Sequence, residues 1–357
     1  MQESSQARYV LRITRALLFA ALASLSFASA HAITIPTVPV GSLGNAADPL
    51  TGNLYGSVSY DYRIGTTEVT NAQYAAFLNE KAKSDPLALY NTNMGSSFSG
   101  GITRSGVSCT FTYTAKTNMS DKPVIYVRWY GAIRFANWLH NGQGAGDTET
   151  GAYTLLGGTA TPSNGLSITR NVGATWFLPS EDEWYKAAYH QPSAQGGDAD
   201  DYWLYPTASN SETTRAAANS TGDISNPGAN VANYGLGADW NFQNGNVTTV
   251  GSAGPLSESY YGTADQGGNV LEWNEALIEG SARGLRGGSF ISGSASSLRS
   301  SFRSASSPTG LSGTFGFRVA TVPEPSTYAL AAIGIIALLC VRRRNNKAAW
   351  SAGKLVA

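Results

Sequence analysis

The stretch from Asp265 to Arg318 constrains the fold most, because it concentrates glycines, arginines and aromatic side chains in a chain otherwise rich in Ser, Thr, Asn and Gly. Gly287 and Gly288 allow two backbones to approach closely, since glycine has no Cβ. The aromatic residues offer large surfaces for burial. Each arginine can fasten an irregular loop through several planar hydrogen bonds. The stretch therefore predicts a domain that side chains hold together more than long strand ladders do.

Length and composition limit the class of protein. The chain has 357 residues, enough for one large domain or two small ones. Its 42% hydrophobic content permits a core, and its 40 glycines are typical of a loop-rich fold. The net charge is zero, so nothing favours nucleic acid as a partner. No internal repeat or linker divides residues 57–321, which predicts a single domain there.

Ordered motifs run through this region. G-N-V-L-E-W, R-G-G-S-F, L-R-S-S-F-R and G-F-R-V-A follow Y-R-I-G-T-T-E-V-T-N-A-Q-Y-A-A-F-L and W-F-L-P-S-E-D-E-W-Y-K-A-A. As a set they resemble the formylglycine-generating (sulfatase-modifying factor) family over residues 57–321. The resemblance implies an α+β, irregular and loop-rich fold of the formylglycine-generating-enzyme type, a distant relative of the C-type lectin fold. Fold alone does not fix function.

The N-terminus has the three parts of a secretory signal. Arginines at positions 8, 12 and 15 precede an apolar run over 16–27 and then the small-residue sequence A-S-A-H-A. This order predicts a signal peptide over residues 1–32, cleaved after Ala30 or Ala32. Residues 33–56 are punctuated by Pro and Gly and are interpreted as an extended lead-in.

The C-terminus has the features of a second targeting signal. V-P-E-P-S precedes the apolar run 328–341 and then three arginines. The run is shorter than the roughly 20 residues of a comfortable membrane helix, and the basic cluster would hold its end, residues 347–357, in the cytoplasm. Residues 322–346 resemble the PEP-CTERM sorting signal of Gram-negative bacteria. The resemblance implies export, transient anchoring in the inner membrane, processing by an exosortase-type enzyme, and delivery to the cell surface or beyond.

Three helices and one strand are predicted from local patterns. Thr70 with Gln73 and Ser180 with Glu183 form capping boxes, which predicts helices starting at Asn71 and just after Ser180. The first of these is expected over residues 71–83, and apolar spacing predicts another over 129–140. Alternation over residues 58–64 predicts a strand.

Cysteine and histidine are scarce. Cys109 lies in a strand-like run and is either a reactive thiol or, as the pattern favours, a small buried residue. The mature chain keeps two histidines, His140 and His190, both expected at helix C-termini where the helix dipole favours them. Two histidines without a third ligand are too few for a zinc or iron site.

The family resemblance implies a copper site that this chain lacks. Active members carry two cysteines five residues apart after the R-G-G-S-aromatic motif, and these positions here are Ser292 and Ser297. Serine is a hard ligand, whereas Cu(I) prefers thiolates, so copper is not expected and no catalytic residue is assigned. Both serines are interpreted as ordinary loop residues.

Calcium is the cofactor that the resemblance implies. The family's structural calcium positions match Asp265, Gly268, Val270 and Glu272, which offer two carboxylates and two carbonyls to a hard cation. A second family site begins at Asn233 and Tyr234, but its downstream acid is not clear in this sequence. The alternative for Asp265 and Glu272 is a hydrogen-bonded turn without metal.

The combined prediction is an exported, calcium-stabilised binding or structural module without the family's oxidase chemistry. A ligand groove for a peptide or an extracellular polysaccharide is predicted from residues of the motif-rich stretch, namely Trp273, Arg286, Phe290, Ser292, Ser297, Arg299, Arg303 and Arg318. The same residues are alternatively structural. The alternative functions are a copper-dependent formylglycine-generating oxidoreductase, another enzyme activity on this fold, and a surface-display protein whose domain fills a matrix.

Overall fold

The computed structural model describes residues 32–322. The chain divides into two units, residues 1–34 and 35–357, and every element described below belongs to the second. The predicted signal peptide, except for its last residue, and nearly all of the sorting segment lie outside the described residues. Within residues 32–322, no helix has both the length and the apolar character that a membrane span requires.

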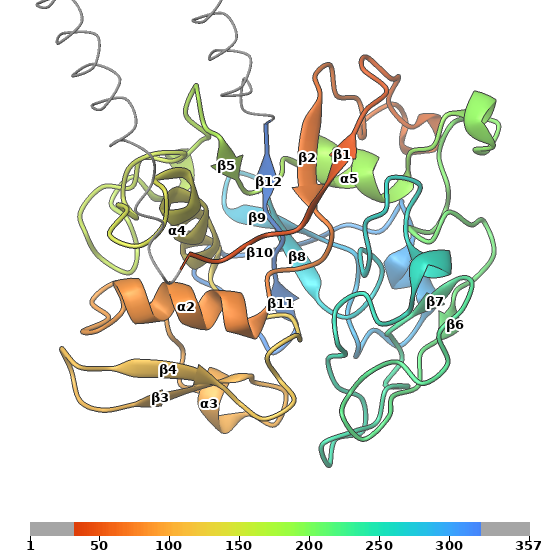
Figure 1. Cartoon of the computed structure of the whole chain (residues 1–357). Helices are drawn as coiled ribbons and strands as arrows, with labels where there is room; N and C mark the ends of the chain where they lie inside the picture. The colour runs from red at the N-terminus through yellow and green to blue at the C-terminus, as the bar shows by residue number, and fades with distance from the viewer. Residues whose placement is uncertain (1–31, 323–357) are drawn as a thin grey trace, which may run out of the picture. The chain divides into compact units, whose positions relative to one another are not determined.

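The first sheet joins the beginning and the end of the described domain. Its four strands lie in the order β1 (Thr37–Val40), β2 (Tyr62–Gly65), β12 (Ala320–Thr321) and β5 (Trp176–Phe177), all antiparallel to their neighbours (Figure 1). Strand β12 is central, since Ala320 pairs with Ile64 on one side and Phe177 on the other. The predicted strand at 58–64 is wrong in its first half, because β2 starts only at Tyr62.

The second sheet is built by the motif-rich stretch. Its order is β10 (Ser304–Ser306), β9 (Ala282–Arg286), β8 (Leu271–Ile278) and β11 (Phe315–Gly316). Strands β8 and β9 form a hairpin with a register shift after Trp273, and β11 runs parallel to β8. Two small sheets add β3 (Ile102–Ser105) with β4 (Thr112–Ala115) and β6 (Thr214–Arg215) with β7 (Val231–Ala232).

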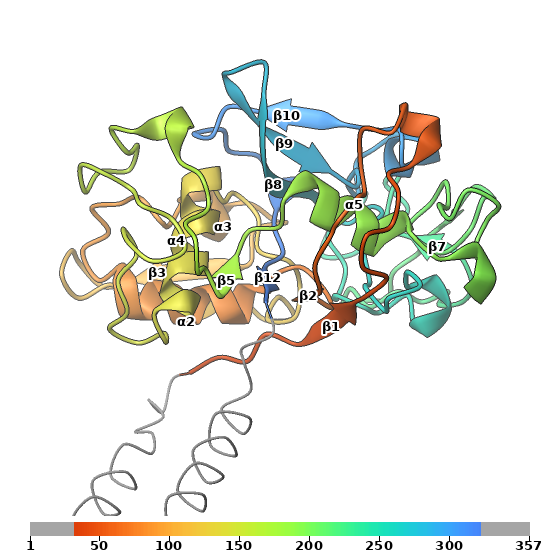
Figure 2. The ribbon, with the colours of Figure 1, turned by 90° about the horizontal axis from the view of Figure 1, so that it is seen from above.

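The predicted helices are confirmed at their starts. They are α2 (Asn71–Lys81), α4 (Trp129–His140) and α5 (Glu181–Tyr189), and both capping boxes are present. Helix α2 ends two residues before the predicted end. The remaining helical segments are short: α3 (Asn93–Ser96) and 3-10 turns at Pro49–Thr51, Gly165–Ser167, Ser193–Gln195, Pro255–Ser257 and Ala295–Leu298. Helix α5 packs against β8, as Figure 2 shows from above.

Aromatic rings fill the core between α2 and α4. Tyr74 and Phe77 of α2 meet Phe135 and Trp138 of α4, and Phe317 closes the cluster, with ring centroids 5.3–6.2 Å apart. Tilted and edge-on ring contacts of this kind stabilise a core beyond the burial of their area. The cluster anchors both helices to the chain segment that enters β12.

Arg318 is the buried centre of the fold. Its guanidinium pairs with Glu272 at 2.7 Å, and neither side chain is exposed. It also donates to the carbonyls of Gly65 at 2.9 Å, Thr66 at 3.2 Å and Ala264 at 2.8 Å. One arginine therefore fastens three chain segments that are distant in sequence, which confirms the expected use of arginine in irregular loops.

We predict that Arg318→Met strongly destabilises the domain, because it leaves the Glu272 carboxylate buried without a cation. Removing one partner of such a pair costs about 3–5 kcal/mol in the free energy of unfolding, measurable by denaturant titration. The control is Arg303→Met, which removes an arginine whose side chain is 34% exposed and pairs with Glu181. Equal losses in the two variants would contradict a central role for Arg318.

Candidate functional site

The two serines at the family's cysteine positions lie in a surface loop after β9. The Ser292 hydroxyl accepts the Ser289 N–H at 3.0 Å, and the Ser292 carbonyl accepts the Gly235 N–H at 2.8 Å. Ser297 lies in the 3-10 turn Ala295–Leu298. A Cβ on Gly288 would lie 2.9 Å from the Ser297 carbonyl, which confirms that a glycine is needed for close backbone approach there.

The structure separates the residues of the predicted groove. Four of them, Trp273, Arg286, Phe290 and Arg318, are buried and belong to the interior. Trp273 donates its indole N–H to the Val127 carbonyl at 2.9 Å, so its role is packing and positioning. A groove lined by all eight residues is therefore wrong. The other four, Ser292, Ser297, Arg299 and Arg303, are at least partly exposed.

The exposed arginines are bound by neighbouring side chains. Arg303 and the buried Arg286 both pair with Glu181, at 2.6 and 2.7 Å. Arg299 donates to the Tyr205 hydroxyl at 3.0 Å. Glu181 is the first residue of α5, where the helix dipole alone favours a carboxylate. The sequence therefore did not indicate that Glu181 also bridges two arginines.

Glu272, one of the predicted calcium ligands, is already paired with the guanidinium of Arg318. Both oxygens of Glu272 accept from Arg318, at 2.7 and 2.8 Å, and one also accepts the Trp184 N–H at 2.9 Å. Asp265 accepts the Gly251 N–H at 2.5 Å. Among residues 32–322 no group of three or more His, Cys, Asp or Glu side chains is arranged to hold a metal ion. A calcium ion would have to share Glu272 with Arg318 and take most of its ligands from backbone and amide oxygens.

The charge around Arg318 nevertheless fits an added cation. Glu68, Asp265 and Glu272 place three carboxyl groups near one guanidinium. Burial and the neighbouring carboxylates raise the pKa of Glu68 well above its usual range, and burial raises that of Asp265 to about 6. Two buried oxygens, Oε2 of Glu68 and Oδ1 of Asn233, have no hydrogen-bond partner in the described chain. Asn233 is a predicted ligand, and an amide oxygen is one of the oxygen donors that calcium accepts.

Cys109 is exposed, which corrects the prediction of a buried residue. It lies in the turn between β3 and β4 rather than in a strand, with a positive backbone φ of 76°. A turn at the tip of a hairpin has no core to pack against, so the surrounding Thr and Phe residues gave the wrong signal.

Both histidines lie at helix ends as predicted. His140 ends α4 and accepts the Thr175 N–H at 3.1 Å, and His190 follows α5 and hydrogen bonds to the Tyr261 hydroxyl at 2.7 Å. The dipole does not decide the charge of His190, because burial and the nearby Lys186 lower its pKa to about 4. His190 is therefore neutral at ordinary pH.

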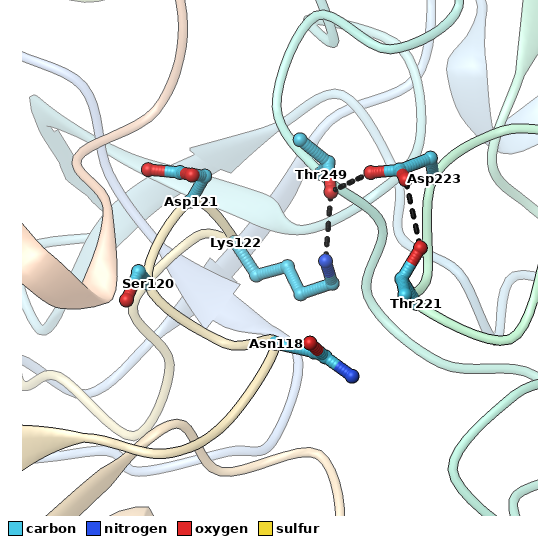
Figure 3. Close-up of a pocket in the computed structure, with 7 residues that line it drawn as sticks. All are labelled: Asn118, Ser120, Asp121, Lys122, Thr221, Asp223 and Thr249. Carbon is cyan, nitrogen blue, oxygen red and sulfur yellow. Dashed lines mark hydrogen bonds between the residues drawn. The ribbon is translucent and has the colours of Figure 1, made fainter.

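A polar pocket that the sequence did not reveal lies between loops from three parts of the chain (Figure 3). Its volume is about 310 Å³, and its lining is Asn118, Ser120, Asp121, Lys122, Thr221, Asp223 and Thr249. Backbone hydrogen bonds join the loops, from Val250 N to Asp121 O and from Thr249 N to Gly222 O, both at 2.9 Å. Dispersed polar residues in Gly/Ser/Thr-rich segments look like ordinary loops, so no local pattern marks this site.

Two consecutive hydrogen bonds link Lys122, Thr249 and Asp223 across the pocket. Lys122 Nζ donates to the Thr249 hydroxyl at 2.7 Å, and that hydroxyl donates to Asp223 at 2.6 Å (Figure 3). Hydrogen bonds from Thr249, Thr221 and Asn219 lower the pKa of Asp223, whereas burial lowers that of Lys122. A carboxylate with a lowered pKa is a weak general base, so this arrangement is suited to binding more than to proton transfer.

Comparison with known proteins identifies the class. The Sulfatase-modifying factor enzyme 1-like domain matches residues 41–322, and the PEP-CTERM protein-sorting motif matches residues 321–344. The first match covers most of the chain, so the protein belongs to the sulfatase-modifying factor (formylglycine-generating enzyme) family, and the α+β, loop-rich, single-domain fold predicted from its motifs is confirmed. No curated protein matches this chain.

Solved structures resemble the chain at low identity. Treponema denticola variable protein 1 is 21% identical with a TM-score of 0.49, over 82% of this chain and 96% of that one. CarF is 21% identical with a TM-score of 0.48, over 82% and 99%. PvdO from Pseudomonas aeruginosa is 16% identical with a TM-score of 0.42, over 82% and 93%.

The lowered pKa of His190 predicts a pH effect. An unfolded histidine has a pKa of about 6.5, so below that pH the unfolded chain gains a proton that folded His190 binds only near pH 4. This contribution to stability is full above about pH 6.5 and is lost as pH falls towards 4. Thermal melts over this range should show a shallower pH slope for His190→Gln than for the wild type. Identical slopes would contradict the assignment, and Tyr261→Phe, which keeps the imidazole, serves as the control.

Proposed function

We propose that this chain is a non-catalytic binding or structural module that acts at the cell surface or in the extracellular matrix. The PEP-CTERM motif implies export, sorting to the cell surface and recognition by an exosortase-type processing enzyme. Transient anchoring in the inner membrane before that processing is part of the proposal. The binding site of the module is the Lys122 pocket.

The observation that carries the proposal is the pair Ser292 and Ser297. A serine hydroxyl is neither a soft ligand for Cu(I) nor able to pass through thiol oxidation. The Ser292 hydroxyl is used by the backbone of its own loop, where it accepts the Ser289 N–H. An acyl-transfer role would need an adjacent base, and neither histidine hydrogen bonds to these serines.

A copper test separates the module from an oxidase. We predict that the wild-type domain, given Cu(I) and a cysteine-containing peptide, consumes no oxygen above the buffer control. The matched variant Ser292→Cys with Ser297→Cys should gain tight Cu(I) binding in competition with a Cu(I) chelator, because thiolates then occupy both positions. Saturable oxygen consumption by the wild type would overturn the proposal in favour of an enzyme.

Calcium is proposed as a structural ion near Asn233 and the Asp265 carboxylate. At a hundredfold excess over its Kd, a ligand that binds only the folded state adds about 2.7 kcal/mol to stability. We predict that EGTA lowers the melting temperature by several degrees, that calcium restores it, and that Asp265→Asn reduces the difference. Elemental analysis without calcium, together with an unchanged melting temperature, would remove the ion from the proposal.

A further inference from the structure

The accessible rim of the Lys122 pocket offers unused hydrogen-bonding groups. Asn118, Ser120 and Asp121 are exposed, and their side chains make no hydrogen bond to any residue between 32 and 322. They come from one short loop, and Ser120 and Asp121 lie across the Lys122 side chain from Thr221 and Asp223 (Figure 3). An amide, a hydroxyl and a carboxylate together offer both donors and acceptors. A ligand that satisfies them must also carry both.

The charges in the pocket disfavour an anionic ligand. Lys122 is only 2% exposed and forms the floor, where its ammonium is already compensated through Thr249 by Asp223. Asp121 adds a second carboxylate at the rim. An anion would face two carboxylates, Asp121 and Asp223, for one buried ammonium. A neutral ligand avoids this repulsion, and it carries no charge that has to be desolvated on binding.

The shape of the pocket is fixed before any ligand binds. The Lys122 ammonium lies 4.8 Å from the centre of the Trp240 ring. Gly222, at a φ of +81°, fits against both, because a Cβ there would lie 2.5 Å from Trp240 and 2.6 Å from Lys122. A preformed polar pocket loses little conformational entropy when it binds.

Two exposed phenylalanines belong to the loop of Trp240 and to a loop that is bonded to it. Phe242 is 97% exposed and follows Trp240 by two residues, and Phe98 is 59% exposed. The Asn241 side chain donates to the Phe98 carbonyl at 3.0 Å, which brings the two phenylalanine-bearing loops together. Neither ring lines the pocket. An exposed ring suits a ligand with an apolar face, so these two would meet only parts of a longer ligand that extend beyond the pocket.

We propose that the Lys122 pocket binds the sugar units of an uncharged polysaccharide, with Ser120 and Asp121 hydrogen bonding to ligand hydroxyls. This inference rests on the proposed function, because it names the ligand of the same module. Vicinal hydroxyls supply donors and acceptors at the spacing of one short loop, and the C–H face of a sugar ring suits an exposed phenylalanine.

The test uses the mature, exported chain on an array of neutral oligosaccharides built from hexose, deoxyhexose and N-acetylhexosamine units. Uronate and glucosamine oligomers provide anionic and cationic comparisons. Binders are then titrated by calorimetry against Ser120→Ala and Asp121→Ala. Each variant should bind about two- to tenfold more weakly, because each loses a hydrogen bond to the ligand. Both should melt like the wild type, since neither side chain has a partner in the fold.

The control is Glu212→Ala, which removes an exposed carboxylate outside the pocket and should leave affinity unchanged. Absence of saturable binding to every neutral oligosaccharide would overturn the inference, as would equal affinity in the pocket variants or a preference for uronate or glucosamine oligomers. Oxygen consumption is measured on the same sample. Failed glycan binding without oxidase activity rejects only the ligand class, whereas oxidase activity rejects the non-catalytic function itself.

Discussion

The buried ion pair of Arg318 and Glu272 is the interaction on which the rest of the domain depends. Glu272 belongs to β8 of the second sheet, and Arg318 lies just before β12 of the first. The same guanidinium donates to the Gly65 carbonyl at the end of β2 and to the Ala264 carbonyl. Because most strands have only two to five residues, backbone ladders alone could not set the relation between the sheets, and a fully hydrogen-bonded arginine does so at one point.

Other ion pairs extend this principle. Arg170 pairs with Glu183 of α5 at 2.6 Å and with Glu275 of β8 at 2.7 Å, so it connects a helix start with a sheet. Glu183 is also the acceptor of its own capping box. Such pairs offset the cost of burying charge only when their geometry is well satisfied. They therefore favour one arrangement of the long loops around them.

Sequence reasoning succeeded where the signal was local and failed where it was not. The capping boxes at Thr70 and Ser180 fixed the helix starts, because the interacting residues are three positions apart. The pairing of Arg286 with Glu181 was not predictable, since the two residues lie more than a hundred positions apart in the chain. Lys122, Thr249 and Asp223 form one hydrogen-bonded chain from three distant loops. No pattern within a window of residues can bring them together.

One chain segment, residues 235–240, contacts both the loop that carries Ser292 and the Lys122 side chain of the pocket. The serines at the family's cysteine positions can therefore affect the pocket. Gly235 and Leu236 donate to the carbonyls of Ser292 and Phe290 at 2.8 and 2.9 Å. A few residues further on, Trp240 of the same segment lies over the Lys122 ammonium. A loop that cycled between thiol and metal-bound states would pass its movement to this segment. With Ser292 accepting the Ser289 N–H, the loop can instead hold this segment in one position, which agrees with the proposed binding module.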